Sequence, residues 1–171
     1  IYTFVWEFVY TYVHNLNKHT AGISAYTSTS TYMFSMVSYK NKELRVHHLI
    51  DSSKLRSLIN TSDRLIFLVD TNSVRTTVAS QIIYEVTQII ESLRSNHPHL
   101  NRKWTISINT VFPCLRTSTK FSTNDALTSN INAYNLQLHE LAATMNFSIW
   151  NTLITVDHLN SDNMHVHISN L

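Results

Sequence analysis

The sharpest hydrophobic pattern in the chain is the run Leu65–Val69, which is bounded by Arg64 and Asp70. Because the run is short, continuous and rich in β-branched and aromatic side chains, it predicts a strand buried on both faces. A polar stretch, Asp70–Ser73, follows at once. In an open α/β sheet, ligands bind at the loop that leaves the carboxyl end of a strand. Asn72 is therefore expected to point into a crevice.

Two long amphipathic helices are predicted downstream. The first follows the polar stretch, with Thr76 or Thr77 as its N-cap and Pro98 just beyond its end. The second spans about Asp125–Met145. Apolar residues recur along the first helix with a period of 3.6, at Val78, Ile82, Ile83, Val86, Ile89, Ile90 and Leu93.

Further strands are expected on both sides of these helices. Alternation from Trp104 to Phe112 predicts a strand that Pro113 ends, and Phe147–Trp150 predicts a short last strand. Near the start, Tyr2–Phe8 is read as a strand, and Thr31–Ser38 as a short helix or strand. From Arg64 onward strands and helices alternate, which indicates a parallel α/β sheet in a single domain, residues 1–171.

Composition narrows the class of protein. The chain is 43% hydrophobic and only 14% charged, and its formal net charge of +2 is too small to argue for nucleic acid. The single cysteine, Cys114, excludes an internal disulfide and is expected to be a small buried residue. No apolar run approaches the ~20 residues of a membrane span, and no signal peptide is predicted. Since the chain begins with Ile1, we expect a fragment, and its compartment is left open.

Glycine is almost absent, with Gly22 alone in 171 residues. Turns that need a positive φ are therefore expected to use Asn, Asp or Ser.

Two polar clusters follow predicted strands and carry possible chemistry, Asp70–Ser73 and Ser161–His165. The amide of Asn72 can donate to a developing oxyanion. His165 is a possible general base near neutral pH, and Asp162 can fix its tautomer and stabilise the imidazolium. The alternative reading is structural: Asn72 as a cap, and Asp162 with His165 as a surface pair.

In these clusters the chain resembles the SGNH (GDSL-type) hydrolases. Asp70–Arg75 after a strand is similar to their third block, Gly-x-Asn-Asp, and Asp162–His165 is similar to their last block, Asp-x-x-His. The helix that carries Asn132–Asn135 also fits the pattern, and the resemblance covers about Arg64–His167. The form is close to the small esterase-like domains of some mobile-element proteins.

The resemblance implies a three-layer α/β/α fold with a small parallel sheet of flavodoxin-like topology. It implies hydrolysis of an acyl or acetyl ester by an activated serine, with no cofactor and no metal. Asn72 would be an oxyanion donor, His165 the base and Asp162 its partner. In the family the nucleophilic serine follows the first strand.

The nucleophile is the main departure from the family. Trp6–Phe8 stands where the family has Gly-Asp-Ser. One hypothesis is a serine displaced into Ser24–Ser30, with Ser24 as a weak candidate. The other is a catalytically dead domain that binds a partner such as RNA, for which Arg75 and Arg116 are expected near the edge of the crevice.

Family glycines are also replaced. Asp70 takes the place of the third-block glycine, where its carboxylate would oppose an oxyanion, and Asn163 that of the last-block glycine. Spacing puts Thr31 or Tyr32 near the second-block glycine.

The ten histidines do not predict a metal site. Their clusters, His47-His48, His97-Pro98-His99 and His165-Val166-His167, lack cysteine partners and the helical His-Glu-x-x-His spacing of zinc enzymes.

Overall fold

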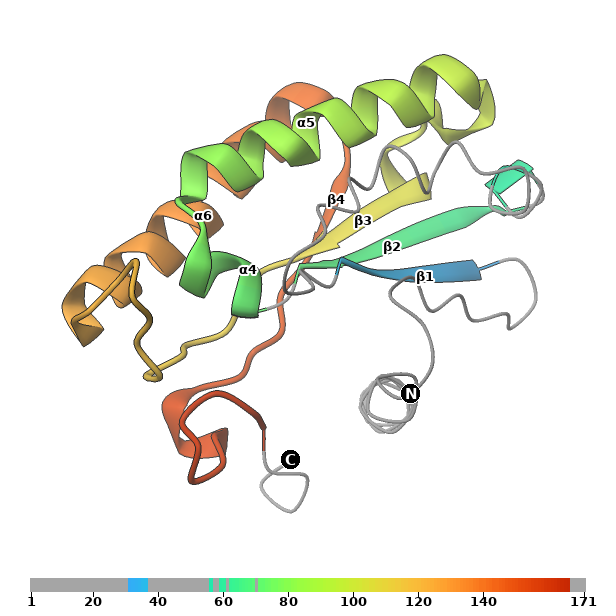
Figure 1. Cartoon of the computed structure of the whole chain (residues 1–171). Helices are drawn as coiled ribbons and strands as arrows, with labels where there is room; N and C mark the ends of the chain where they lie inside the picture. Colours follow the sequence, from blue (N-terminus) through green and yellow to red (C-terminus); the bar gives the residue numbers. More distant parts are fainter. Residues whose placement is uncertain (1–30, 37–55, 57–58, 61, 70, 167–171) are drawn as a thin grey trace.

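The computed structural model describes residues 31–36, 56, 59–60, 62–69 and 71–166, with no side-chain account of 31–36. Its centre is a four-stranded, all-parallel sheet in the order β1-β2-β3-β4 (Figure 1). The strands are β1 (Thr31–Met36), β2 (Arg64–Val69), β3 (Ile106–Asn109) and β4 (Ser148–Trp150). The predicted α/β class is confirmed, and Thr31–Met36 is a strand.

Two long helices, α5 (Ala79–Asn96) and α6 (Asn124–Met145), pack together over one face of this sheet (Figure 1). Their apolar stripes and the strands share one core, which includes the fully buried Leu65, Ile90, Ile106, Leu127 and Leu138. Burial of each such side chain contributes about 1.5–3 kcal/mol. The strand predicted at Tyr2–Phe8 lies outside the described residues.

The polar segment after β2 is helical instead of a loop. It forms α4 (Thr71–Thr76), and α5 starts only at Ala79, with Val78 as an N-cap that makes no side-chain bond. The prediction that Thr76 or Thr77 caps α5 is wrong. Thr76 instead donates its hydroxyl to the Asn72 carbonyl (2.7 Å), and Asn130 Oδ1 of α6 accepts the Ala79 N–H (2.8 Å).

The strand predicted from Trp104 is shorter than expected at both ends. Trp104 belongs to the 3₁₀ helix η2 (Lys103–Thr105), which follows a similar turn, η1 (Pro98–Asn101). At the other end, Val111 leaves the sheet because the Asn135 side chain accepts its N–H and donates to its carbonyl, both at 2.9 Å. The Asn135 side chain of α6 thus makes the backbone hydrogen bonds that a neighbouring strand would make.

Asparagine takes over turns that glycine usually makes, as the composition predicts. Among the described residues a positive φ occurs at Asn146 (55°), Asn163 (58°) and Leu153 (54°). Asn tolerates this region better than most side chains. In the same part of the chain, no helix combines the length and apolarity needed to cross a bilayer.

Candidate active site

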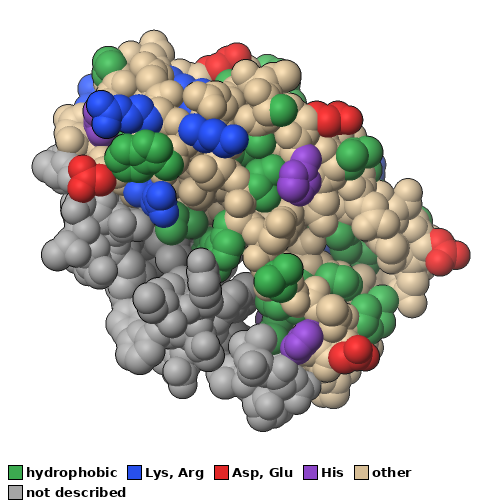
Figure 2. Space-filling model, turned by 180° about the vertical axis from the view of Figure 1, so that it is seen from behind, with side chains coloured by type: hydrophobic (Ala, Val, Ile, Leu, Met, Phe, Trp, Pro, Cys, Tyr) green, Lys and Arg blue, Asp and Glu red, His purple; other side chains and the backbone are tan. Residues whose placement is uncertain are grey.

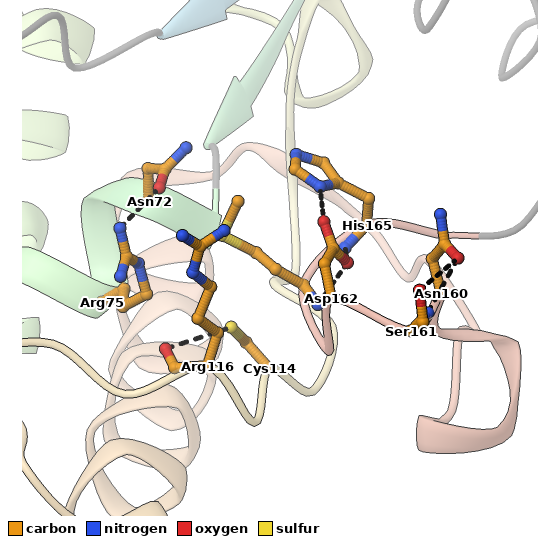
Figure 3. Close-up of polar contacts among 9 residues, drawn as sticks. Asn72, Arg75, Cys114, Arg116, Asn160, Ser161, Asp162 and His165 are labelled. Atoms are coloured by element: carbon orange, nitrogen blue, oxygen red, sulfur yellow. Dashed lines mark hydrogen bonds and ion pairs between the residues drawn. The ribbon is translucent and has the colours of Figure 1, made fainter.

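The candidate site lies at the carboxyl edge of the sheet. Because β2, β3 and β4 are parallel, the segments that follow them leave from the same edge. Asn72 lies in α4, just after β2, while Asp162 and His165 lie in the segment after β4 that contains η3 (Val156–His158). Figure 3 shows these side chains with the loop after β3 between them.

Asp162 and His165 form a hydrogen-bonded pair. The Asp162 Oδ2 atom contacts the His165 Nδ1, and the two side chains are 33% and 47% exposed. The second carboxylate oxygen, Oδ1, accepts the backbone N–H groups of Met164 (3.0 Å) and His165 (2.9 Å). The carboxylate therefore holds both the backbone turn and the ring. His165 Nε2 makes no hydrogen bond to a described residue, so the ring presents it at the surface of the edge.

The Asp162 carboxyl is kept ionised by its partners. Burial alone would raise its pKa, but the hydrogen bonds from the His165 backbone, the His165 ring and the Met164 backbone outweigh burial and lower the pKa to about 2. A carboxylate at neutral pH is what a base-orienting aspartate requires.

The turn that carries the pair is docked on the loop after β3. The Asn160 N–H donates to the His165 carbonyl (2.6 Å), and the Asn163 N–H donates to the Asn160 carbonyl (2.8 Å). From the neighbouring loop, the Leu115 N–H donates to the Asn163 carbonyl (2.9 Å). Met164 and Val166 are only 6% and 8% exposed, so the turn is anchored on both sides of His165.

Arg75 orients the Asn72 amide and ties α4 to the same loop. Its Nη2 donates to Asn72 Oδ1 (3.2 Å), and its Nη1 donates to the Thr117 carbonyl (3.1 Å). With the oxygen turned toward Arg75, the amide nitrogen of Asn72 points away from it (Figure 3). The loop after β3 is thus bonded to α4 on one side and to the His165 turn on the other.

A buried amide that sequence reasoning missed fixes the end of β2. Asn109 is 6% exposed, and its Oδ1 accepts the Val69 N–H (2.6 Å) while its Nδ2 donates to the Val69 carbonyl (3.2 Å). The Tyr134 hydroxyl, whose pKa is raised by burial, donates to the Asn109 carbonyl (3.4 Å). The signal that could have found Asn109 is a lone amide at the end of a short, fully buried strand.

Cys114 is buried, as expected, with its thiol near the Arg116 carbonyl (3.8 Å). Burial raises the pKa of this thiol, which disfavours the thiolate that a cysteine nucleophile needs. No group of three or more His, Cys, Asp or Glu side chains suited to a metal ion occurs within the described residues.

The remaining predicted positions divide into two groups. Thr31 and Tyr32, which spacing puts near the second-block glycine, lie at the amino end of β1 and pair with Arg64 and Leu65. They therefore lie at the end of the sheet opposite to the one that carries His165. Trp6–Phe8, Ser24 and Asp70 lie outside the described residues.

No protein-family model matches the sequence, and no curated protein is similar to it. Among solved structures, a carbohydrate esterase family 3 from Talaromyces cellulolyticus is similar, with a TM-score of 0.47 and 18% sequence identity. The likeness covers 64% of this chain, and the chain spans about half (51%) of the length of that esterase.

Proposed function

We propose that this domain hydrolyses acyl or acetyl esters through a serine nucleophile. The observation that carries the proposal is the Asp162–His165 pair at the carboxyl edge of a parallel sheet, with the His165 ring bonded through Nδ1 and half exposed. Asn72, on the same edge, adds an oriented amide donor. A base, its orienting carboxylate and an oxyanion donor are what acyl transfer needs besides the nucleophile.

The chemistry would run in two steps. His165 Nε2 takes the proton of the serine hydroxyl as its oxygen bonds to the ester carbonyl carbon, while Asp162 stabilises the imidazolium. The amide of Asn72 donates to the oxyanion. The C–O bond then breaks, and the alcohol leaves with the proton from His165. Water, deprotonated by His165, attacks the acyl-serine, releases the acid and restores the hydroxyl.

The topology of β1 narrows the search for the serine. Met36 pairs with Val69, so the carboxyl end of β1 lies at the same edge as the end of β2. In the sequence, Ser38 comes two residues after Met36, outside the described part of the chain. Ser38 therefore joins Ser24 as a hydroxyl to be tested.

Labelling with a fluorophosphonate probe tests the proposal without knowledge of the natural ester. We expect one serine to be labelled in the folded protein, and peptide mass spectrometry to identify it. Labelling should be lost after heat denaturation and in His165→Ala, but retained in the matched control His139→Ala, an exposed histidine of α6. Alanine at the labelled serine should also abolish it. Folded protein that takes no label, or label that does not depend on His165, contradicts the proposal and favours the catalytically dead alternative.

A further inference from the structure

The opposite, amino edge of the sheet carries an exposed indole. Trp104 is 47% exposed because η2 lifts it out of the β3 ladder. Arg64, the first residue of β2, donates its Nε to the Trp104 carbonyl (2.8 Å). The guanidinium carbon of Arg102 lies 6.0 Å from the centre of the indole ring, a cation–π arrangement. An aromatic plate and two guanidinium groups are therefore held together at this edge.

Positive charge is concentrated here. Arg64, Arg102 and Lys103 are all exposed, and within the described residues none of them forms an ion pair. Asp63 is an exposed carboxylate beside Arg64 in the sequence. On one part of the molecular face drawn in Figure 2, Lys and Arg side chains gather around an exposed hydrophobic side chain. We name Arg64, Arg102, Lys103 and Trp104 the Trp104 patch.

We propose that the Trp104 patch binds single-stranded nucleic acid, with a base stacked on the indole and phosphates on the three cations. Alternating stacking and cationic groups are the means by which proteins hold single strands without reading sequence. A duplex offers no unstacked base to Trp104. A membrane surface would need several neighbouring apolar side chains, whereas the other exposed large hydrophobics among the described residues lie on α5, α6 and the segment after β4.

This location differs from the crevice edge that the sequence predicts for RNA. At that edge, the Arg75 guanidinium already donates hydrogen bonds to the Thr117 carbonyl and to Asn72 Oδ1, so its role is structural. The Trp104 patch lies at the start of β2, and the six residues of β2 separate it from the carboxyl edge by about 20 Å. A bound strand would therefore leave His165 accessible, and this proposal does not depend on ester hydrolysis.

Fluorescence anisotropy with a labelled 12-nucleotide single-stranded RNA tests the charges. We expect affinity to fall with salt, and the double variant Arg102→Glu/Lys103→Glu to bind at least tenfold more weakly with the magnitude of the salt slope lowered by about 1.4. The matched control is Arg116→Glu/Lys120→Glu, which makes the same change in net charge at exposed positions of the loop after β3. This control should change affinity less than threefold.

Stacking is tested separately. Trp104→Ala should weaken binding by about fivefold or more, the lower range for loss of one base–aromatic stack. Trp104→Phe should recover part of the loss, and Tyr84→Ala, which removes an exposed aromatic of α5, should bind like the parent. Circular dichroism establishes that each variant is folded.

Three results would overturn the proposal. The first is equal loss in the two double variants, which means unspecific attraction by net charge. The second is no preference for single-stranded RNA over a duplex of the same length. The third is tight binding to anionic phosphatidylserine vesicles with none to RNA.

Discussion

At the scale of one residue, Asn163 forms a left-handed turn without glycine. Its φ of 58° lies in the left-handed region, which glycine adopts more readily than any other residue. Its carbonyl accepts the Leu115 N–H, and its N–H donates to Asn160, so the left-handed conformation is needed to hold the turn of His165.

Substitution at Asn163 should separate backbone conformation from side-chain chemistry. Asn163→Gly should keep the stability of the parent to within about 0.5 kcal/mol, whereas Asn163→Ala should cost about 1 kcal/mol because a Cβ disfavours this region. Urea unfolding measures both. If the alanine variant were as stable as the glycine variant, the left-handed turn would not constrain this position.

Asp162 makes stability depend on pH in a defined window. Its folded-state pKa of about 2 lies below the ~3.9 of an unfolded aspartate, so the ionised carboxylate stabilises the fold above that unfolded value. This contribution is lost as pH falls from about 4 toward 2. We expect the difference in unfolding free energy between the parent and Asp162→Asn to shrink as the pH falls below about 4. A difference that stayed the same between pH 4 and pH 2 would contradict the lowered pKa of Asp162.

At the scale of elements, three asparagine amides join secondary structures that are far apart in the sequence. Asn109 ties β3 to the end of β2, and Asn135 of α6 holds Val111. Asn130 of α6 accepts the Ala79 N–H at the start of α5 and donates to the carbonyls of Val74 (2.7 Å) and Thr77 (3.0 Å). Each amide satisfies backbone groups that would otherwise be buried without partners.

Asn130 should be the costliest of the α6 polar residues to replace. Asn130→Ala strands one N–H and two carbonyls in a site where the side chain is 8% exposed, and we expect a loss of about 2–3 kcal/mol in unfolding free energy. Asn132→Ala, at an exposed position of the same helix, should be neutral or slightly stabilising because alanine favours helix. Equal effects of the two variants in urea unfolding would show that the hydrogen bonds of Asn130 contribute little to the free energy of unfolding.

The amides of Asn130 and Asn135 also explain which boundaries of helices and strands the sequence could predict. β2 and the two long helices follow from patterns carried by their own residues, and their observed bounds lie close to the predicted ones. The start of α5 and the end of β3 depend on Asn130 and Asn135, which lie 51 and 24 residues away from Ala79 and Val111. The local hydrophobic pattern contains no information about such distant partners. The predictions that Thr76 caps α5 and that Val111 continues β3 are therefore wrong.

The contacts of the candidate site also differ in whether the sequence alone could predict them. Asp162 and His165 are three residues apart, so their contact could be expected from spacing alone. The role of Arg75 in fixing Asn72 is also local, yet an arginine in a polar segment reads as a surface charge. The docking of the His165 turn through Leu115 joins two distant loops and becomes visible only in the fold.

At the scale of the whole molecule, the parallel sheet separates two chemistries. Its carboxyl edge gathers Asn72, Asp162 and His165, and its amino edge presents the Trp104 patch. Variants at the two edges should therefore act independently, since no described residue of the patch contacts the His165 turn. Arg102→Glu/Lys103→Glu should lower RNA affinity and leave ester hydrolysis within twofold of the parent.

We propose that His165 is the general base in ester hydrolysis, and the rate of hydrolysis of 4-nitrophenyl acetate measures that activity. Rates of the parent, His165→Ala and the control His139→Ala are compared at pH 7.5 in folded protein. We expect kcat/KM to fall by about 10²–10⁴ in His165→Ala and to stay within twofold of the parent in His139→Ala. A parent that is no faster than His165→Ala would contradict it.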